Sequence, residues 1–146
     1  MFKDEVFQDL KALAGVPIFI LLVTSFFVLG RREVALQLSL GFVASYAVTI
    51  ATRAVYFRRR PDKEGYKGFI SKIDASSFPS LHSMRAGVLA SVLSLSFSNI
   101  ILTIVFALAS IGVAISRVVQ KRHFASDVVA GLIIGVVIGC SIVYFV

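Results

Sequence analysis

Residues 116–127 read SRVVQKRHFASD and lie between two of the most apolar runs of the chain, NIILTIVFALASIGVAI at 99–115 and VVAGLIIGVVIGCSIVYFV at 128–146. The stretch contains arginines, a lysine, a histidine and an aspartate at the edge of segments apolar enough for a membrane. Ionisable side chains at membrane depth are costly, so they indicate a functional site by default. The stretch therefore predicts a membrane fold around it and a chemical role within it.

The composition supports the membrane interpretation. Hydrophobic residues make up 58% of the 146 residues, and the mean hydropathy is +0.90, whereas soluble domains are about 45–50% apolar. The net charge of +7 could attract nucleic acid. However, no basic run with interleaved aromatic residues forms a separate polar face, so we expect no nucleic acid partner. We assign the cations to the membrane flanks and to an anion site.

The apolar runs predict an all-α fold, an integral membrane bundle of about five transmembrane helices in a single domain over residues 1–146. Phe2, Val6, Leu10 and Leu13 recur at helical spacing, so residues 1–11 are expected to form an interfacial helix. The expected spans lie near residues 12–30, 34–57, 78–97, 100–116 and 126–146.

Five spans fix which segments share a side of the membrane. The N-terminus, the polar loop at 58–77 and the stretch at 117–127 fall on one side, so the two polar segments meet although they are far apart in the sequence. That side carries most of the lysines and arginines. The positive-inside rule then predicts a multi-pass cell-membrane protein with this side in the cytoplasm, although cations that bind a substrate would not count in that rule.

His123 and Asp127 are four residues apart and share one helix face if the last span has already begun there. A carboxylate that binds one imidazole nitrogen fixes the tautomer and leaves the other nitrogen free as a nucleophile or base. The alternative is an ordinary helix pair that stabilises the fold slightly.

The sequence PSLH at 79–82 opens another span. Proline is favoured in the first turn of a helix, and the free N–H groups of that turn attract anions. Ser80 could add a hydroxyl donor, and His82 would lie one turn further along the same rim. Ordinary capping with an incidental histidine is the alternative.

Three arginines complete the pattern, because a guanidinium group matches phosphate oxygens bidentately. Arg53 and Arg60 are seven residues apart, which is two helical turns if the helix persists, and Arg117 lies six residues before His123. We expect the remaining cations to be surface charges that face lipid headgroups; these are Arg58, Arg59, Lys63, Lys67, Lys121 and Arg122.

These parts predict phosphoryl transfer. The arginines and a helix N-terminus would hold a phosphoryl group, one histidine would attack phosphorus, and the other would protonate the leaving oxygen. No cluster of carboxylates or cysteines indicates a metal, so the arginines would neutralise the charge, and neither a metal nor another cofactor is expected.

With these motifs in order, the chain resembles the type 2 phosphatidic acid phosphatases, the PAP2 superfamily, over residues 34–146. The family signature consists of Lys-x6-Arg-Pro, Pro-Ser-Gly-His and Ser-Arg-x5-His-x3-Asp. The matching positions are Arg53, Arg60 and Pro61, then Pro79, Ser80, Leu81 and His82, then Ser116, Arg117, His123 and Asp127. Arg53 replaces a lysine and keeps its charge. Leu81 replaces a glycine, which matters if that position needs a left-handed backbone.

The resemblance implies a helical core shared with the haloperoxidases, which are soluble enzymes and so do not fit this hydropathy. It implies that His123 is the nucleophile that forms a phosphohistidine, that Asp127 orients and stabilises it, and that His82 is the general acid. The implied phosphate-binding groups are Arg53, Arg60, Arg117, Ser80 and the backbone N–H of Leu81. Many members have six membrane helices, and we expect five here.

The predicted function is an integral membrane, metal-independent lipid phosphatase that acts on an isoprenoid diphosphate or a phospholipid monoester. Its partners would be the phosphorylated lipid and membrane lipids. FPSLHSMRAG at 78–87 and RRRP at 58–61 resemble the branch that acts on polyisoprenoid diphosphates. The alternatives are a non-catalytic lipid- or phosphate-binding membrane protein and a lipid transporter on the same fold.

Gly131, Gly135 and Gly139 recur every four residues in the last span. Small residues at this spacing let helices pack closely, and we favour packing within the bundle over dimerisation. Cys140 lies in the same run and is expected to be a small buried apolar residue.

Overall fold

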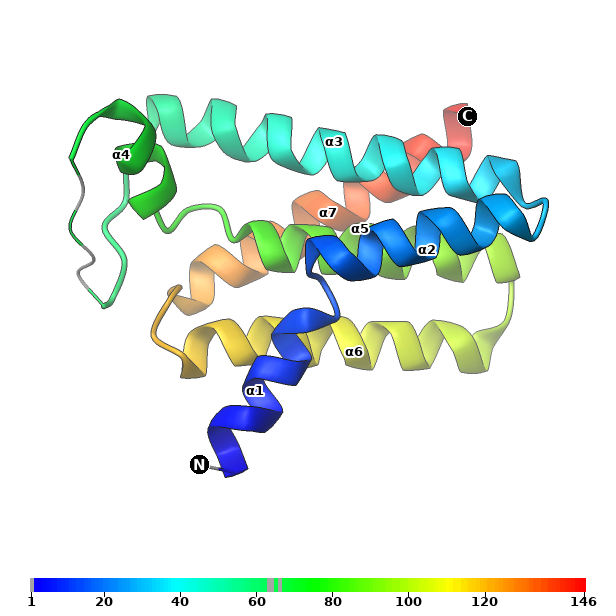
Figure 1. Ribbon diagram of the computed structural model, residues 1–146, viewed down its shortest axis with the longest axis horizontal. Coiled ribbons are helices and arrows are strands. Elements are labelled where there is room, and N and C mark those ends of the chain that lie inside the picture. The colour runs from blue at the N-terminus through cyan, green and yellow to red at the C-terminus, as the bar shows by residue number, and fades with distance from the viewer. Residues whose placement is uncertain (1, 63–64, 66) are drawn as a thin grey trace.

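The computed structural model describes residues 2–62, 65 and 67–146, and the regular structure in this part of the chain is entirely helical (Figure 1). The described helices are α1 (Phe2–Ala12), α2 (Val16–Val28), α3 (Arg32–Val55), α4 (Phe69–Ala75), α5 (Leu81–Phe97), α6 (Ile100–Val119) and α7 (Ala125–Phe145). The expected surface charge Lys63 lies outside the described residues. The prediction of an all-α membrane bundle is confirmed.

Within the described part of the chain, three helices are long and apolar enough to cross a membrane, namely α3, α6 and α7. Residues Val6–Ala12 of α1 and α2 pass the same test only as a pair that is bent by 46°, which would make a fourth span. Helix α5 is apolar but has 17 residues. The number of clear spans is therefore three or four rather than five.

The expected span at 12–30 differs most from the structure. Helix α2 has only 13 residues, and at about 1.5 Å per residue it covers about 20 Å of a hydrocarbon layer about 30 Å thick. The break before it contains Gly15 as the N-cap and Pro17 in the first turn. Proline has no N–H and fits there, so the chain starts a new helix instead of continuing α1.

Helix α1 packs on α6. The side-chain amide of Gln120 donates a hydrogen bond to the carbonyl oxygen of Phe7 at 2.9 Å, and Leu10 lies against Gly112. The helix expected at residues 1–11 is therefore present, and its place at the membrane interface stays a prediction.

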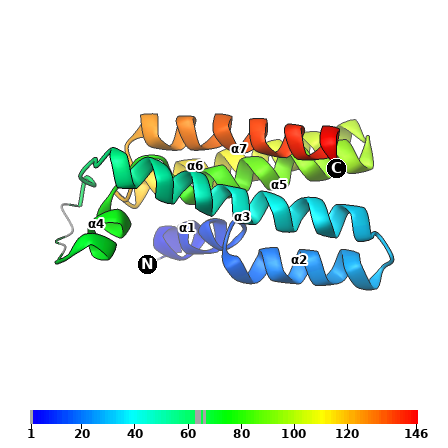
Figure 2. The same cartoon turned by 90° about the horizontal axis from the view of Figure 1, so that it is seen from above.

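The two ends of the bundle differ in content. The N-terminus, α4, the start of α5 and the α6–α7 connection gather at one end, while the α2–α3 and α5–α6 turns and the C-terminus lie at the other (Figures 1 and 2). At the second end, Ser98 turns the chain with a φ of 47°, and the Asn99 side chain caps α6. The expected meeting of the two polar loops is therefore what the structure shows.

Helices α5 and α7 cross with their backbones in close contact. A Cβ atom on Gly131 would overlap the carbonyl oxygen of Ser80, and one on Gly135 would overlap that of Met84. Gly87 of α5 faces the α7 backbone in the same way. The glycine stripe therefore packs within the bundle, as predicted. Cys140, next to this stripe, is exposed rather than buried, which corrects the expectation for it.

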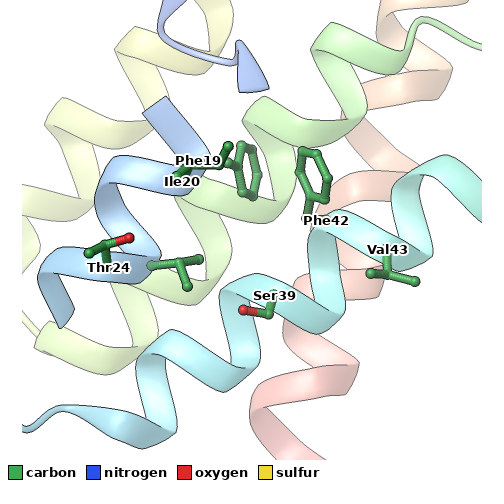
Figure 3. Close-up of a pocket in the computed structure, with 7 residues that line it drawn as sticks. Phe19, Ile20, Thr24, Ser39, Phe42 and Val43 are labelled. Atoms are coloured by element: carbon green, nitrogen blue, oxygen red, sulfur yellow. The ribbon is translucent and has the colours of Figure 1, made fainter. Parts of the chain in front are cut away.

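The apolar core joins α2, α3 and α5, with Phe19, Leu38, Val88 and Val92 buried at its centre. A groove of about 230 Å³ separates α2 from α3 beside this core. Figure 3 shows Phe19 and Phe42 together at one side of it and the hydroxyls of Thr24 and Ser39 on the facing helices. None of its lining residues is titratable, so this groove is not the candidate active site.

Candidate active site

The predicted site residues converge at the polar end of the bundle. The backbone N–H of Ser80 donates to the carbonyl oxygen of Asp127 at 3.1 Å, which ties the start of α5 to the start of α7. Arg53 of α3 donates to the Pro79 carbonyl oxygen at 3.0 Å. The charge of Arg117 acts on His82, and His123 binds the carbonyl group of Ser77, just before this segment. Residues up to 74 positions apart in the sequence, Arg53 and Asp127, thus come together.

His123 is held by a backbone carbonyl group. Its Nδ1 lies 2.7 Å from the carbonyl oxygen of Ser77, and the side chain is only 4% exposed. A carbonyl oxygen can only accept a hydrogen bond, so Nδ1 must carry the proton. The neutral ring then has its lone pair on Nε2, and this is the tautomer that a nucleophilic histidine needs.

The same surroundings keep His123 uncharged. Burial and, to a smaller extent, the positive charges of Arg117, Arg53 and Arg60 lower the pKa of His123 to about 3, while the hydrogen bond to Ser77 opposes them. Since the pKa lies far below 7, the imidazole is neutral near physiological pH. The nucleophilic form is therefore present before any substrate binds.

Asp127 does not form the expected hydrogen bond with His123. Helix α7 begins at Ala125, after the N-cap Phe124, so His123 precedes the helix and the two residues do not share a helical face. One carboxylate oxygen accepts the Phe124 N–H at 2.9 Å, and it lies 3.9 Å from Nδ1 of His123, beyond hydrogen-bond range. Asp127 caps α7 and acts on His123 through its charge alone.

The other oxygen of Asp127 binds a residue that was expected to face lipid headgroups. Arg58 donates to it at 2.6 Å and also stacks over the Phe124 ring at 4.4 Å. Asp127 is fully buried, whereas the Arg58 side chain is 32% exposed. The prediction of Arg58 as a free surface charge is therefore wrong, because the loop turns it back toward the start of α7.

The two ends of the loop at 56–77 pair with each other, and this pairing links the Ser77–His123 contact to the Arg58–Asp127 contact. Ser77 donates its backbone N–H to the Arg58 carbonyl oxygen at 2.8 Å, and residues Arg59 and Ser76 form an antiparallel bridge. Ser77 orients His123 and Arg58 holds Asp127, so one short pairing positions both predicted catalytic residues. Nothing in the spacing of the sequence motifs indicates this pairing.

The PSLH segment caps α5 in a way that differs in detail from the prediction. Pro79 lies before the helix instead of in its first turn, because Ser80 is the N-cap and its hydroxyl oxygen accepts the Ser83 N–H at 3.4 Å. Leu81 is the first helical residue, and it is not among the residues with a positive φ. Leucine therefore strains nothing there, and its N–H is one of the free donors of the first turn.

Arg53 and Arg60 reach the same segment by different routes. Helix α3 ends at Val55, and the next residue is extended, so Arg60 lies in the loop and not two helical turns beyond Arg53. Arg53 donates to the carbonyl oxygen of Ile73 at 3.3 Å, and Arg60 donates to that of Asp74. The two guanidinium groups therefore meet through the loop, and the helix does not persist from Arg53 to Arg60, as their spacing by two helical turns would have required.

Arg53 and Arg117 each have a hydrogen-bond donor without a partner among the described residues. Each is 7% exposed, and the buried Nε of each has no hydrogen-bond partner among the described residues. Arg117 uses Nη1 to bind the Gln120 side chain at 2.8 Å. Buried donors are normally satisfied, so these nitrogen atoms are suited to an anion that brings its own oxygen atoms.

The arrangement can hold and attack a phosphoryl group. Across the described residues, no three His, Cys, Asp or Glu side chains come together as a metal site would require. What does come together is a neutral histidine, a second histidine and several guanidinium groups. His82 is half-buried at the start of α5, and its side chain makes no hydrogen bond within the described part of the chain.

The comparisons with known proteins identify the family and the fold. The model of the PAP2 superfamily matches residues 34–146. The fold is similar to that of LpxE from Aquifex aeolicus, with a TM-score of 0.84, 21% identity, and coverage of 99% of this chain and 87% of that one. Sequence comparison with curated proteins finds no match.

A second similar structure is a transmembrane PAP2 type phosphatidylglycerolphosphate phosphatase from Bacillus subtilis. It has a TM-score of 0.79 and 25% identity, and the match covers 99% of this chain and 76% of that one. The predicted family and the predicted membrane fold are confirmed, and with them the class of enzyme, a lipid phosphatase.

Proposed function

Because the chain belongs to the PAP2 superfamily, we propose that it is a metal-independent phosphatase that hydrolyses an isoprenoid diphosphate or a phospholipid monoester through a phosphohistidine. The observation that carries the proposal is the state of His123, which is buried, neutral and held with its Nε2 lone pair available. Charged lipid headgroups would reach this nitrogen from the polar end of the bundle.

In the first step, Nε2 of His123 attacks phosphorus and forms a P–N bond while the bond to the leaving oxygen breaks. The negative charge of the bound phosphate favours the protonated form of His82, which gives its proton to that oxygen, so the lipid product leaves uncharged at the new hydroxyl. The non-bridging oxygens would be held by Arg53, Arg60 and Arg117, together with the hydroxyl of Ser80 and the N–H of Leu81.

In the second step, water attacks the phosphohistidine. His82, now deprotonated, takes a proton from the water while the P–N bond breaks and inorganic phosphate leaves. The positive charge that His123 carries as a phosphoimidazolium lies near the carboxylate of Asp127, whose Oδ2 is 3.9 Å from Nδ1. Asp127 would therefore stabilise the intermediate through space, while the Ser77 carbonyl group keeps the ring oriented.

The lipid tail would follow a groove between α3, α4 and the start of α5. This groove has a volume of about 350 Å³ and is lined by the charged Arg53 and Asp74 and by the apolar Ile50, Ile70 and Ile73. A groove that combines charged and apolar side chains suits a phosphorylated lipid. Both proposed substrate classes have this form.

The test uses the purified protein in detergent with EDTA and a panel of polyprenyl diphosphate, phosphatidate and phosphatidylglycerophosphate. We expect phosphate release from at least one lipid, and at least a thousandfold loss in His123→Ala and His82→Ala, because a nucleophile and a general acid contribute about that much. Arg31→Ala, at the opposite end of the bundle, is the control. Release at the wild-type rate by both histidine variants would show that the mechanism is wrong.

Two other functions would use the same fold. A non-catalytic phosphate-binding protein or a lipid transporter could hold a headgroup with these arginines, but neither needs a buried histidine fixed in the nucleophilic tautomer. Movement of labelled lipid across vesicles without release of phosphate would favour the transporter.

We also propose that the site faces the cytoplasm, since the polar end carries most of the basic residues. The exposed Arg59 can be replaced by cysteine in a Cys140→Ala background. A membrane-impermeant thiol reagent should then label the protein only after the cells are opened. Labelling of intact cells would place the site outside.

A further inference from the structure

Arg85 of α5 is a buried cation to which neither the three signature motifs nor the proposed mechanism gives a role. Its side chain is 2% exposed, and the one hydrogen bond that it makes among the described residues, to the Tyr46 hydroxyl, is long at 3.5 Å. Its Nε is buried without a partner among the described residues. No carboxylate in that part of the chain lies within ion-pair distance of it.

This isolation is costly. A buried charge is normally paired, and within a membrane-spanning bundle an unpaired one indicates a functional site. The rings of Phe42 and Tyr46 lie 5.8 and 5.5 Å from the guanidinium carbon and offset part of the cost. A methionine would fill the same space without a charge, so the charge itself needs an explanation.

The position of Arg85 relative to His82 supplies one. The two residues are three apart in α5, so they are neighbours on the helix surface. Arg85 lies about 4.5 Å further from the polar end, given a rise of about 1.5 Å per residue. Its charge acts on both His82 and Arg117, which places it beside the site.

The in-line order of the reacting atoms determines which part of the substrate lies beside Arg85. In the proposed function, His123 attacks from one side of phosphorus and the leaving oxygen, protonated by His82, departs on the opposite side. The group attached to that oxygen extends away from His123, past His82 and toward the membrane interior. In a phospholipid monoester this group is a neutral glycerol carbon, and in a lipid diphosphate it is a second phosphate.

We propose that Arg85 binds the phosphate that remains on the lipid, so that the site prefers lipid diphosphates to lipid monophosphates. The inference rests on the proposed function. The reaction breaks the bond between the terminal phosphorus and the bridging oxygen, which takes the proton of His82. Water supplies the oxygen of the released phosphate, and the product is a lipid monophosphate that stays beside Arg85.

The test compares farnesyl diphosphate with farnesyl monophosphate in detergent with EDTA, using wild type, Arg85→Lys and Arg85→Met. The measured quantity is the ratio of kcat/KM for the two substrates. We expect wild type to favour the diphosphate by at least tenfold. Arg85→Met should lower the ratio by about 10- to 100-fold, the usual effect of losing a charge-assisted hydrogen bond, and Arg85→Lys should lower it less.

Arg32→Met is the matched control. Like Arg85→Met, it removes an arginine that lies over an aromatic ring, because the Arg32 guanidinium is 5.7 Å from the Phe27 ring. Arg32 begins α3, at the far end of the bundle (Figure 1). Its ratio should equal that of wild type. An equal fall on both substrates in Arg85→Met would instead assign Arg85 to structural contact between α3 and α5 and overturn the proposal.

A second measurement covers the case in which Arg85→Met does not fold. Methylene diphosphonate should inhibit folded wild type at least tenfold more strongly than methylphosphonate when monophosphate is the substrate. Equal inhibition would reject the subsite while leaving the proposed phosphatase intact. A wild-type protein that hydrolyses none of the lipids would reject the proposed function and the subsite with it.

Discussion

The α5–α7 crossing and the loop at 56–77 both carry site residues, but they are built in opposite ways. At the crossing, glycines bring two backbones into contact, and Ser80 and Asp127 are fully buried. In the loop, α4 has only seven residues, and Phe69 and Ile70 are 67% and 83% exposed. The loop is tied down by arginine side chains that bind its own carbonyl groups.

The difference matches the tasks that we assign to the two regions. Attack and proton transfer need reacting atoms held within a fraction of an ångström, which close backbone packing provides. Binding a phosphate needs donors that can change partners. Arginines that bind backbone carbonyl groups in the absence of substrate can exchange those acceptors for phosphate oxygens at little cost.

The largest effect should come from breaking the crossing. Gly135→Ala places a Cβ atom on the Met84 carbonyl oxygen, which belongs to backbone and cannot turn aside. Overpacking of this kind costs about 1–3 kcal/mol, and it moves His82 relative to Asp127. We expect kcat/KM to fall by at least a hundredfold and the melting temperature in detergent to fall with it.

Gly65→Ala is the loop counterpart, because a Cβ atom on Gly65 meets nothing within 4 Å. It should leave both quantities at their wild-type values. Equal losses from Gly65→Ala and Gly135→Ala would mean that the two regions are equally constrained, contrary to the comparison.

The next effect should come from the contact that joins the two regions. Arg58→Ala removes the partner of the buried Asp127 carboxylate. The protein should lose about 2 kcal/mol of stability, less than from breaking a fully buried ion pair, because Arg58 is partly exposed. We expect kcat/KM to fall by about tenfold or more, with kcat affected more than KM, because the role that we propose for Asp127 is to stabilise the intermediate.

Arg58→Lys should recover part of the lost activity, and Arg59→Ala, which removes an exposed neighbour, should have no effect. A loss of kcat/KM that comes only from a higher KM would mean instead that Arg58 binds the headgroup of the lipid substrate directly.

The sequence predicted the crossing better than the loop. Gly131, Gly135 and Gly139 repeat at helical spacing, so their packing face could be read from local pattern alone. The ends of the helices were less accessible. The chain leaves α3 at Tyr56, whose φ is −121°, and no proline or glycine in the preceding turn indicates this break.

The contacts within the site were hidden for a similar reason. His123 binds a carbonyl group 46 residues away, and Arg58 binds a carboxylate 69 residues away. Such pairs depend on how the loop folds, and a backbone carbonyl partner has no signature in the residue types. The motif spacing could therefore indicate candidate reacting residues but not the bonds that orient them.

A moderate effect on stability should appear when the pH is lowered, because the imidazole of His123 is buried. The pKa of His123 falls from about 6.5 in the unfolded chain to about 3 in the folded protein. Between these values only the unfolded state takes up the proton, so stability is complete above pH 6.5 and is lost as the pH falls toward 3. The loss of stability should be about 1 kcal/mol between pH 6.5 and 5.5.

The measurement compares melting temperatures in detergent for wild type and His123→Asn across this range. The asparagine amide can still donate to the Ser77 carbonyl group but does not titrate. Wild type should therefore lose more stability than the variant as the pH falls. Parallel curves would show that His123 is protonated equally in both states and is not buried as described.

The smallest effect should come from the surface tie between the loop and the 116–127 stretch. Arg122 donates to the Asp62 carboxylate at 2.6 Å, and the two side chains are 39% and 25% exposed. Exposed pairs of this kind contribute about 0–1 kcal/mol and weaken with salt. Asp62→Asn should therefore lower the melting temperature by no more than about two degrees, less in high salt, and should leave kcat/KM within about twofold of wild type. A tenfold loss of activity would mean that catalysis needs the loop to be held in one position. The loop would then not be more adaptable than the α5–α7 crossing, contrary to the comparison.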